Sequence, residues 1–478
     1  MKKFYITTSI PYANAPPHIG FAQEAVQADV LARYHRLLKK DVFYLTGTDE
    51  HGLKIKKAAQ EAGKSPKEFA DDISGKFRKL TKVLNISNND FIRTTDEKRH
   101  LLSVKKVWSV LEKKGDIYKK KYKGYYCSGC EAFVTKKDLK KGKCPHHNQK
   151  PELVEEENYF FRLSKYLPRI KKKIEKDELK IIPKTRKNEV LGNIRAGFGD
   201  VSFSRDEKKY WGFFVPGDKS QIIYVWGDAL LNYISALGYA ENSEKFKKYW
   251  PADVHCLGKD ILKFHALIWP AMLLSLRLPL PKTIFVHGFI TVKGRKMSKS
   301  LGNVVDPFGC VEKYGADVLR YYLLREIPAT EDGDFTYDKF EQRYNADLAC
   351  GIGNLTSRVA KMAEKIFSGK VQPSGKIQNQ NIRKAVKDAE KKYKKALEDF
   401  KFNESLRAVW DLIAFCDRYI EKERPWDNKN QKSRIKNQRV VSDLSLVLNN
   451  IADFLLPFLP ETSDKIKKRV IPLFPRIC

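Results

Sequence analysis

Short apolar runs alternate with amphipathic segments through the first part of the chain. Phe4 to Ile10 is an apolar, β-branched run that ends at Pro11 and predicts a strand. Phe21 to Lys40 carries apolar residues at helical spacing, and Asp41 to Thr46 predicts a second strand. The pattern continues to about residue 115. It indicates an α/β fold built on a parallel sheet.

The pattern changes twice further along. Lys-rich turns and short aromatic strands from residue 116 to about 215 predict an insertion between two halves of the sheet. We expect the sheet to resume with Gln221 to Trp226, Asp253 to Gly258 and Thr283 to Gly288. From about residue 347 only helical patterns follow. The expected regions are sheet halves at 1–115 and 216–290, the insertion at 116–215, a connecting region at 291–346 and a helical domain at 347–478.

The charge balance points to a polyanionic partner. The 478 residues include 91 Lys and Arg against 58 Asp and Glu, a formal net charge of +33. Nucleic acid fits better than a membrane, because apolar stretches such as Ile268 to Leu280 are too short and too interrupted by proline to span a bilayer. The N-terminus also lacks the apolar core of a signal peptide. We therefore expect a cytoplasmic protein.

Pro17-His18-Ile19-Gly20 lies in the predicted loop between the first strand and the first helix. Such a loop is expected to present free backbone N–H groups and the positive helix end to an anion. Gly20 would let a phosphate approach the backbone, and a ring nitrogen of His18 could donate to a phosphate oxygen. The alternative is a loop histidine without a ligand.

A second motif, Lys296-Met297-Ser298-Lys299-Ser300, lies on a polar segment between Gly294 and Gly302. Two lysines on a loop with glycine hinges can close on negative charge as it develops on a phosphate group. The alternative is an ordinary solvated basic loop.

Cysteine spacing predicts a metal site in the insertion. Cys127 and Cys130 form a Cys-x-x-Cys pair, and after thirteen residues Cys144 and His147 form a Cys-x-x-His pair. Two such turns bring three thiolates and an imidazole into the tetrahedron that Zn²⁺ prefers. His146 is the alternative fourth ligand, and a disulfide is the alternative chemistry. Four protein ligands leave no position for water, so one structural zinc per chain is expected.

In this order, the two phosphate-type motifs resemble the paired signatures of class I aminoacyl-tRNA synthetases, and further blocks narrow the resemblance to the methionyl-tRNA synthetases. These blocks are Pro11–Asn14, Leu31–Tyr34, Thr46–Gly52, Tyr224–Ala229, Gly258–Ile261 with Phe264-His265, and Leu301–Pro307. The resemblance covers nearly the whole chain. It implies a split Rossmann-type sheet, a zinc-bearing connective insertion, a stem-contact region after the lysine loop, and an α-helical anticodon-binding bundle.

The resemblance also implies an activity and its residues. Methionine and ATP, with Mg²⁺, would form methionyl-adenylate, and the methionyl group would pass to tRNA(Met), including the initiator tRNA. Expected residues are His18, Lys296 and Lys299 for catalysis; Asn14, His18, Gly20, Lys259, Asp260 and Lys299 for ATP; Ile10, Tyr12, Asp49, Trp226, Tyr233, His265 and Trp269 for methionine; and Asn354, Arg358 and Trp426 for the anticodon. Asp49 would bind the ammonium group.

Other interpretations remain open for single residues. Each apolar pocket residue alone could belong to an ordinary core. Asn354 and Arg358 could cap or salt-bridge the bundle while Trp426 packs between helices. The chain ends just after the bundle, so we expect a monomer.

Two other proteins could carry the same blocks. One is a class I synthetase for leucine, isoleucine or valine, although the insertion is short for an editing domain. The other is a catalytically silent RNA-binding relative, because Phe21 stands where the first signature usually has a second histidine. We expect the pocket to be repacked around the phenyl ring, which can be buried there.

Overall fold

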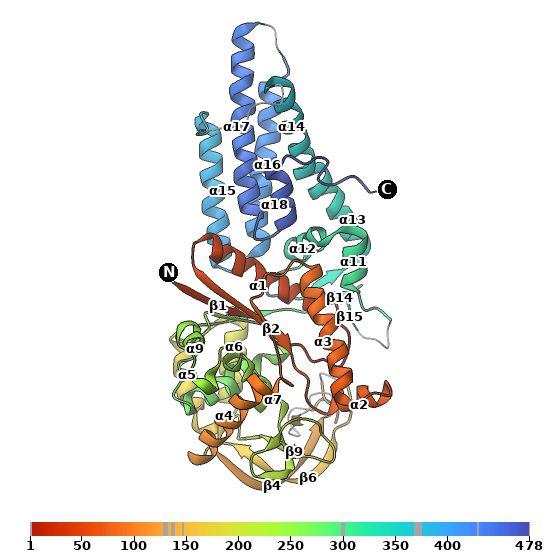
Figure 1. Ribbon diagram of the computed structural model, residues 1–478, viewed down its shortest axis with the longest axis vertical. Coiled ribbons are helices and arrows are strands. Elements are labelled where there is room, and N and C mark those ends of the chain that lie inside the picture. The colour runs from red at the N-terminus through yellow and green to blue at the C-terminus, as the bar shows by residue number, and fades with distance from the viewer. Residues whose placement is uncertain are drawn as a thin grey trace. The chain divides into compact units, whose positions relative to one another are not determined.

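The computed structural model describes residues 2–127, 132–134, 139–145, 148–297, 302–367, 375–427 and 430–477 (Figure 1). Contacts divide the chain into two compact units. The first unit comprises Met1–Pro17, Leu38–Thr81 and Ser87–His287. The second unit comprises His18–Leu37, Lys82–Ile86 and Gly288–Cys478. The helix after the first strand therefore groups with the C-terminal part of the chain.

A six-stranded parallel sheet forms the centre of the first unit. Its order is β3-β2-β1-β12-β13-β7. The bounds are β1 Lys3–Thr7, β2 Asp41–Thr48, β3 Asp90–Arg93, β7 Lys180–Ile182, β12 Val254–Gly258 and β13 Thr283–His287. All but the first residue of β2 are buried, as expected for a strand covered on both faces. The predicted strands at 41–46, 253–258 and 283–288 are confirmed as β2, β12 and β13.

Two strands differ from the sequence-based expectation. The run Gln221 to Trp226 does not continue the parallel sheet. It forms β11 (Asp218–Ile223), which pairs antiparallel with β9 (Ser204–Asp206) and β10 (Phe214–Val215). The parallel sheet instead takes β7, from within the expected insertion, as its edge strand beside β13. An apolar run shows that a strand is buried, but it does not show which strand will pair with it.

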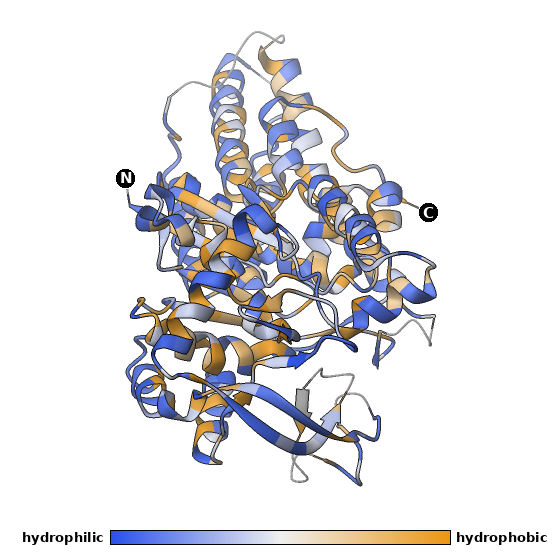
Figure 2. Cartoon of the chain, turned by 60° about the horizontal axis from the view of Figure 1, so that its bottom comes forward, coloured by the Kyte–Doolittle hydropathy of each residue, from blue (hydrophilic) through white to orange (hydrophobic). Residues whose placement is uncertain are grey.

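A long antiparallel hairpin dominates the insertion. β4 (Ile117–Cys127) pairs with β6 (Glu152–Phe161), with β5 (Ala132–Val134) and β8 (Val201–Ser202) at the edges. Lysines of β4 face glutamates of β6 across the ladder, for example Lys123 opposite Glu155. Figure 2 shows hydrophilic colour over much of this hairpin. Opposite charges facing one another favour this pairing.

Helices complete the first unit. They are α2 Leu53–Glu61, α3 Pro66–Val83, α4 Leu102–Lys113, α5 Leu167–Glu175, α6 Lys184–Arg195, α7 Val225–Ala229, α8 Asn232–Ser235, α9 Glu244–Tyr249 and α10 Trp269–Ser275, with short helical segments η1 Glu97–Leu101, η3 Leu163–Lys165, η4 Tyr239–Glu241, η5 Lys259–Ile261 and η6 Phe264–Ile268. One hydrophobic core cluster joins the sheet, helices α4 to α10 and the base of the hairpin.

The second unit is mainly helical. A small sheet of β15 (Arg295–Lys296), β14 (Ile290–Val292) and β16 (Gly333–Phe335) precedes the long helices. The helices are α1 Ile19–Leu37, α11 Pro307–Tyr314, α12 Ala316–Arg325, α13 Tyr337–Arg343, η8 Tyr344–Gly353, α14 Asn354–Phe367, α15 Gln380–Glu398, α16 Phe402–Glu423, α17 Gln431–Leu455 and α18 Pro460–Lys467. Figure 1 shows α14 to α17 running along one another as a bundle. Within the described residues, strands end at Phe335, which confirms the predicted helical domain.

A buried arginine connects three parts of the second unit. Arg320, on α12, is fully buried and forms an ion pair with the buried Asp29 of α1 at 2.8 Å. Its guanidinium also donates to the carbonyl oxygens of Leu84, Pro457 and Phe458. These partners satisfy a charge that would otherwise be costly to bury.

None of the helices in the described part of the chain combines the length and apolar character needed to cross a membrane.

We predict that Arg320→Met lowers the free energy of unfolding by about 3 kcal/mol or more, because the buried Asp29 loses a partner and three carbonyl groups lose their donor. Denaturant unfolding followed by circular dichroism measures the change. Arg343→Met is the control, because Arg343 forms a more exposed pair with Glu326 and should cost only about 0–1 kcal/mol. Equal losses for both variants would contradict the role of Arg320.

Candidate active site

Four of the residues expected to bind methionine and ATP follow parallel strands at one edge of the sheet. Tyr12 follows β1, Asp49 follows β2, and Lys259 and Asp260 follow β12. The carboxyl ends of parallel strands meet at the same edge, and the strand order reverses between β1 and β12. Tyr12 and Asp49 are register partners, with the Ala13 N–H donating to the Asp49 carbonyl at 2.8 Å. The sheet therefore holds the two loops together.

Six expected methionine residues gather around one hydrophobic cluster. Tyr233, His265 and Trp269 are buried. The Tyr233 hydroxyl lies 2.8 Å from His265 Nε2, and the Tyr233 and Trp269 rings are 5.9 Å apart. The others, Ile10, Tyr12 and Trp226, are partly buried and pack against the same core. Asp49, on the loop paired with Tyr12, is the buried carboxylate of the set.

Hydrogen bonds fix the protonation of two histidines in this cluster. His265 Nδ1 donates to the Ile261 carbonyl at 3.1 Å, so Nε2 accepts from the Tyr233 hydroxyl. Trp269 donates to His255 Nε2, so His255 Nδ1 donates to Thr7. Burial lowers the pKa of His265 to about 4, and it lowers the pKa of His255 well below its usual value. The aromatic cluster is therefore uncharged near neutral pH.

His18 caps α1 with its own ring. The Gly20 N–H donates to His18 Nδ1 at 3.0 Å, so Nε2 is the ring nitrogen that carries the proton. A Cβ on Gly20 would lie 2.8 Å from Cε1 of this ring, so glycine is required for the close approach. His18 itself is exposed. The geometry is compatible with the expected donation from His18 to a phosphate.

Some backbone N–H groups at this turn are not free, in contrast to the expectation. The Ile19 N–H donates to the Val305 carbonyl, and the Phe21 N–H donates to the His18 carbonyl. The helix end and the His18 ring are features of this turn that favour an anion. The Phe21 side chain is 7% exposed, as expected for a pocket repacked around it.

The second motif is described in part. Lys296 ends β15 and is exposed, whereas Lys299 lies outside the described residues. Gly294 and Gly302 both have positive φ, +70° and +60°, which side chains other than glycine rarely adopt. After the motif, Asp306 caps α11 by accepting from the N–H groups of Phe308 and Gly309.

The remaining ATP residues lie in the first unit. Lys259 and Asp260 form the start of η5, directly after β12, and Asp260 is exposed. Asn14 is partly buried in the loop after β1. His18, Gly20 and Lys296 belong to the second unit, so the expected ATP residues are divided between the units.

Two of the predicted zinc ligands are described. Cys127, at the end of β4, and Cys144 are each 1% exposed. The Cys144 carbonyl accepts from the Asn148 N–H, and its N–H donates to Gln149. Cys130, His147 and the alternative ligand His146 lie outside the described residues. Among the described residues, no three His, Cys, Asp or Glu side chains are arranged to hold a metal.

The expected anticodon residues lie on the bundle. Asn354 begins α14 and is exposed. Arg358 forms ion pairs with Glu421 at 2.5 Å and Asp417 at 3.5 Å, both on α16. Trp426, after α16, is 45% exposed. Arg358 therefore forms salt bridges within the bundle, as the alternative interpretation expected. Trp426, however, is not packed between helices.

The structure brings polar and charged residues to this region that the sequence analysis did not select as site residues. Asp228 of α7 accepts from His51 and from His100, and all three are buried. Arg205 is buried with its guanidinium 4.1 Å from the Tyr224 ring centre. His255 bonds to Trp269. The sequence did contain one signal for such a residue, because Asp228 is a charged residue inside an otherwise apolar segment.

Comparisons with known proteins agree with this architecture. A family described as tRNA synthetases class I (M) matches residues 4–152 and 136–360, and an anticodon-binding domain of tRNA ligase matches residues 379–472. The methionine--tRNA ligase of Thermotoga maritima is 43% identical over 475 residues, and that of Clostridium acetobutylicum is 46% identical over 477. Each match covers 98% of this chain, and 75% and 73% of the respective relatives.

Solved structures extend the likeness to the fold. Mycobacterium tuberculosis methionyl-tRNA synthetase in complex with methionyl-adenylate has a TM-score of 0.92 and 37% identity, covering 98% of this chain and 93% of that one. The apo form of that enzyme has a TM-score of 0.86 and 32% identity, covering 100% and 99%. Similarity at this level over nearly the whole chain shows that it belongs to the class I tRNA synthetases of the methionine type.

Proposed function

We propose that the neutral aromatic cluster of the first unit is the side-chain pocket for methionine and that Asp49 binds its ammonium group. The protein is a methionine--tRNA ligase, which activates methionine with ATP and charges tRNA. The observation that carries the pocket assignment is the Tyr233–His265 bond beside Trp269 in a site without a charged ring. A flexible, polarisable thioether packs well against such aromatic edges.

Two substitution steps make up the reaction. The methionine carboxylate attacks the α-phosphate of ATP, the bond from that phosphorus to the bridging oxygen breaks, and pyrophosphate leaves with its electron pair. The terminal ribose hydroxyl of the tRNA then attacks the carbonyl of the mixed anhydride, and AMP leaves. Neither step needs a protein nucleophile, so the chain acts by positioning the reactants and stabilising charge.

The phosphate residues have separate parts in the first step. His18 would donate through Nε2, because Nδ1 already accepts from Gly20. Lys296 and Lys299 would stabilise the charge that develops on pyrophosphate, and Asn14, Gly20, Lys259 and Asp260 would hold the nucleotide. Mg²⁺, bound with ATP, would supply further charge neutralisation. The buried ring of Phe21 replaces a donor, and His18 with the lysines would provide the stabilisation.

We predict that the purified protein exchanges labelled pyrophosphate into ATP only when methionine is present. Equal exchange with leucine, or none with any amino acid, would contradict the proposal.

Lys299→Ala should lower the exchange rate by a factor on the order of 10² to 10³ with little change in the methionine KM, since Lys299 would act mainly in the transition state. Lys293→Ala, which removes an exposed lysine before Gly294, is the control and should retain the rate.

We further propose that Cys127, Cys130, Cys144 and His147 hold one structural zinc ion. The two described thiols fit this assignment, because each is almost completely buried and thiolate sulfur is the ligand that structural zinc sites use most. The metal would crosslink the tip of the insertion.

Elemental analysis should find one zinc per chain. Cys127→Ser should lose this metal and become sensitive to proteolysis within the insertion, because ligand loss removes most of what stabilises so small a site. Cys350→Ser, which removes an exposed cysteine of η8, is the control and should retain zinc. A metal-free protein with a protease-resistant insertion would contradict the site.

Asn354, Arg358 and Trp426 are proposed to read the anticodon of tRNA(Met), including the initiator. The exposed Trp426 supports this, because unpaired bases stack on aromatic faces while amide and guanidinium groups contact their edges. Glu421 and Asp417 would hold the Arg358 guanidinium until a base competes for it. The cytoplasmic location and the monomeric state expected from the sequence remain predictions.

Trp426→Ala should reduce aminoacylation of tRNA by the equivalent of ~1 to 3 kcal/mol, the range measured for base stacking, while methionine-dependent exchange stays nearly unchanged. The two assays on one preparation measure this difference. Ile435→Ala removes an exposed apolar residue of α17 and is the matched control. If both reactions fell together with the melting temperature, Trp426 would be structural.

A further inference from the structure

A buried aspartate next to the methionine pocket binds two imidazoles from distant parts of the chain. Asp228 lies on α7, two residues after Trp226. Its Oδ2 accepts from His51 Nδ1 at 2.6 Å, and its Oδ1 accepts from His100 Nε2 at 2.8 Å. All three side chains are buried. His51 follows Asp49 by two residues, so this contact anchors the loop that carries the proposed ammonium ligand.

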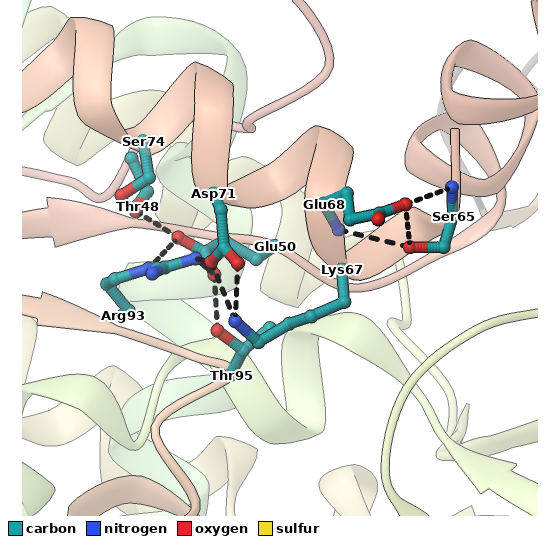
Figure 3. A network of polar contacts seen from close by, with 9 residues as sticks. All are labelled: Thr48, Glu50, Ser65, Lys67, Glu68, Asp71, Ser74, Arg93 and Thr95. Carbon is teal, nitrogen blue, oxygen red and sulfur yellow. Dashed lines mark hydrogen bonds and ion pairs between the residues drawn. The ribbon is translucent and has the colours of Figure 1, made fainter. Parts of the chain in front are cut away.

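Glu50, which lies between Asp49 and His51, is also held in place by hydrogen bonds. Glu50 accepts from Arg93 through both carboxylate oxygens, at 2.7 and 2.8 Å, and from the Thr48 hydroxyl at 2.6 Å (Figure 3). The Glu50 N–H donates to Thr94. Both residues after Asp49 are therefore held by side-chain hydrogen bonds that involve a charged partner, and Asp49 itself is bonded through its main chain to the loop after β1.

The network also reaches the other side of the pocket. His100 Nδ1 lies 2.8 Å from the hydroxyl of Ser235, on α8, the helix that carries Tyr233. Asp228 thus connects the Asp49 loop with the helices of Trp226 and Tyr233. Burial alone would raise the pKa of Asp228, but the charges and hydrogen bonds of His51 and His100 lower it to about 2. The carboxylate therefore stays ionised throughout the physiological range.

A network of this kind contributes more to geometry than to stability. Replacing a buried ionic group with well-packed apolar residues is often neutral or stabilising, so burial of Asp228 is not explained by stability alone. A fully satisfied polar network does restrict the structure to one arrangement. Here the arrangement it restricts is that of the loop and helices that form the pocket.

We propose that Asp228 and His51 are positioning residues that hold the Asp49 carboxylate where it binds the ammonium group of methionine. This inference rests on the proposed role of Asp49. It predicts that loss of the network weakens recognition of the ammonium group while recognition of the thioether side chain is kept.

The test compares two ligands on four proteins. The ligands are methionine and 4-(methylthio)butanoate, which keeps the carboxylate and thioether but lacks the amino group. The proteins are the unaltered chain, Asp49→Asn, Asp228→Asn and the double variant. Inhibition of pyrophosphate exchange gives the affinity for the analogue, and titration gives the affinity for methionine. Asp228→Asn keeps the side-chain volume but removes the charge.

We expect Asp228→Asn to weaken methionine binding roughly 10- to 100-fold, the scale of a 1 Å misplacement. Affinity for the analogue should stay within about twofold. When Asp228→Asn is added to Asp49→Asn, the methionine affinity of the double variant should differ from that of Asp49→Asn by no more than about twofold, because Asp228 acts through Asp49. His51→Asn, which keeps an N–H donor near the Nδ1 position, should retain more methionine affinity than His51→Leu.

Asp116→Asn is the matched control. Asp116 is also buried, and it accepts from Lys165, Tyr166 and Ser275, none of which is a residue of the proposed pocket. It should lower stability without changing the preference for methionine over the analogue. That preference separates positioning from a merely structural role.

Four outcomes would overturn the inference. Equal weakening of both ligands in Asp228→Asn would make the network structural. A further full loss in the double variant would show that Asp228 does not act through Asp49. If Asp49→Asn itself left the preference for methionine unchanged, the role of Asp49 would fail, and the inference with it, whereas a normal Asp228→Asn beside an impaired Asp49→Asn would overturn the inference alone.

Discussion

The pairing of β1 with β12 is the contact on which the proposed methionine site depends. Ile6 and Thr7 are register partners of Val254 and His255, almost 250 positions away in the chain. Because both strands are parallel, their following loops leave the sheet at one edge. That edge receives Tyr12 from one side and Lys259 from the other, and β2 adds Asp49. Without this ladder, the residues of the site would have no common location.

Desolvation sets the second constraint. The site is buried in the hydrophobic core, so every polar group there needs a partner or must be neutral. His255 and His265 are neutral, and their hydrogen bonds leave no ambiguity about which nitrogen carries the proton. Asp228 is charged and has two imidazoles around it. The pocket thus combines neutral aromatic surfaces with a few fixed charges, which suits a zwitterion with an apolar side chain.

The second unit also provides partners for a charged group that it buries. Arg320 is buried where carbonyl groups and Asp29 satisfy it, and it gives α1 a fixed relation to the end of the bundle. At the surface of that bundle, Trp426 remains exposed, although an aromatic residue gains free energy from burial. An exposed aromatic side chain offers a face on which an unpaired base can stack.

Features that depend on local spacing could be predicted from the sequence. β2, β12, β13 and the helical domain follow from apolar periodicity, and α1 begins two residues before its predicted start because His18 caps it. The sequence also proposed the two signatures, the aromatic pocket residues and Asp49, and the structure brings Tyr233, His265 and Trp269 together, while their roles stay predictions. The cysteine spacing indicated a zinc site by the same kind of argument.

Features that depend on a distant partner were decided only by the tertiary structure. The sequence placed the run at residue 221 in the wrong sheet and did not show that β7 would complete the right one. It did not show that the N–H groups of Ile19 and Phe21 would be occupied, or that His51 and His100 would meet at Asp228. A residue's type records that it can be buried, charged or bonded. Which group satisfies it is settled by folding, because the partners come from segments whose separation in sequence carries no information about their distance in space.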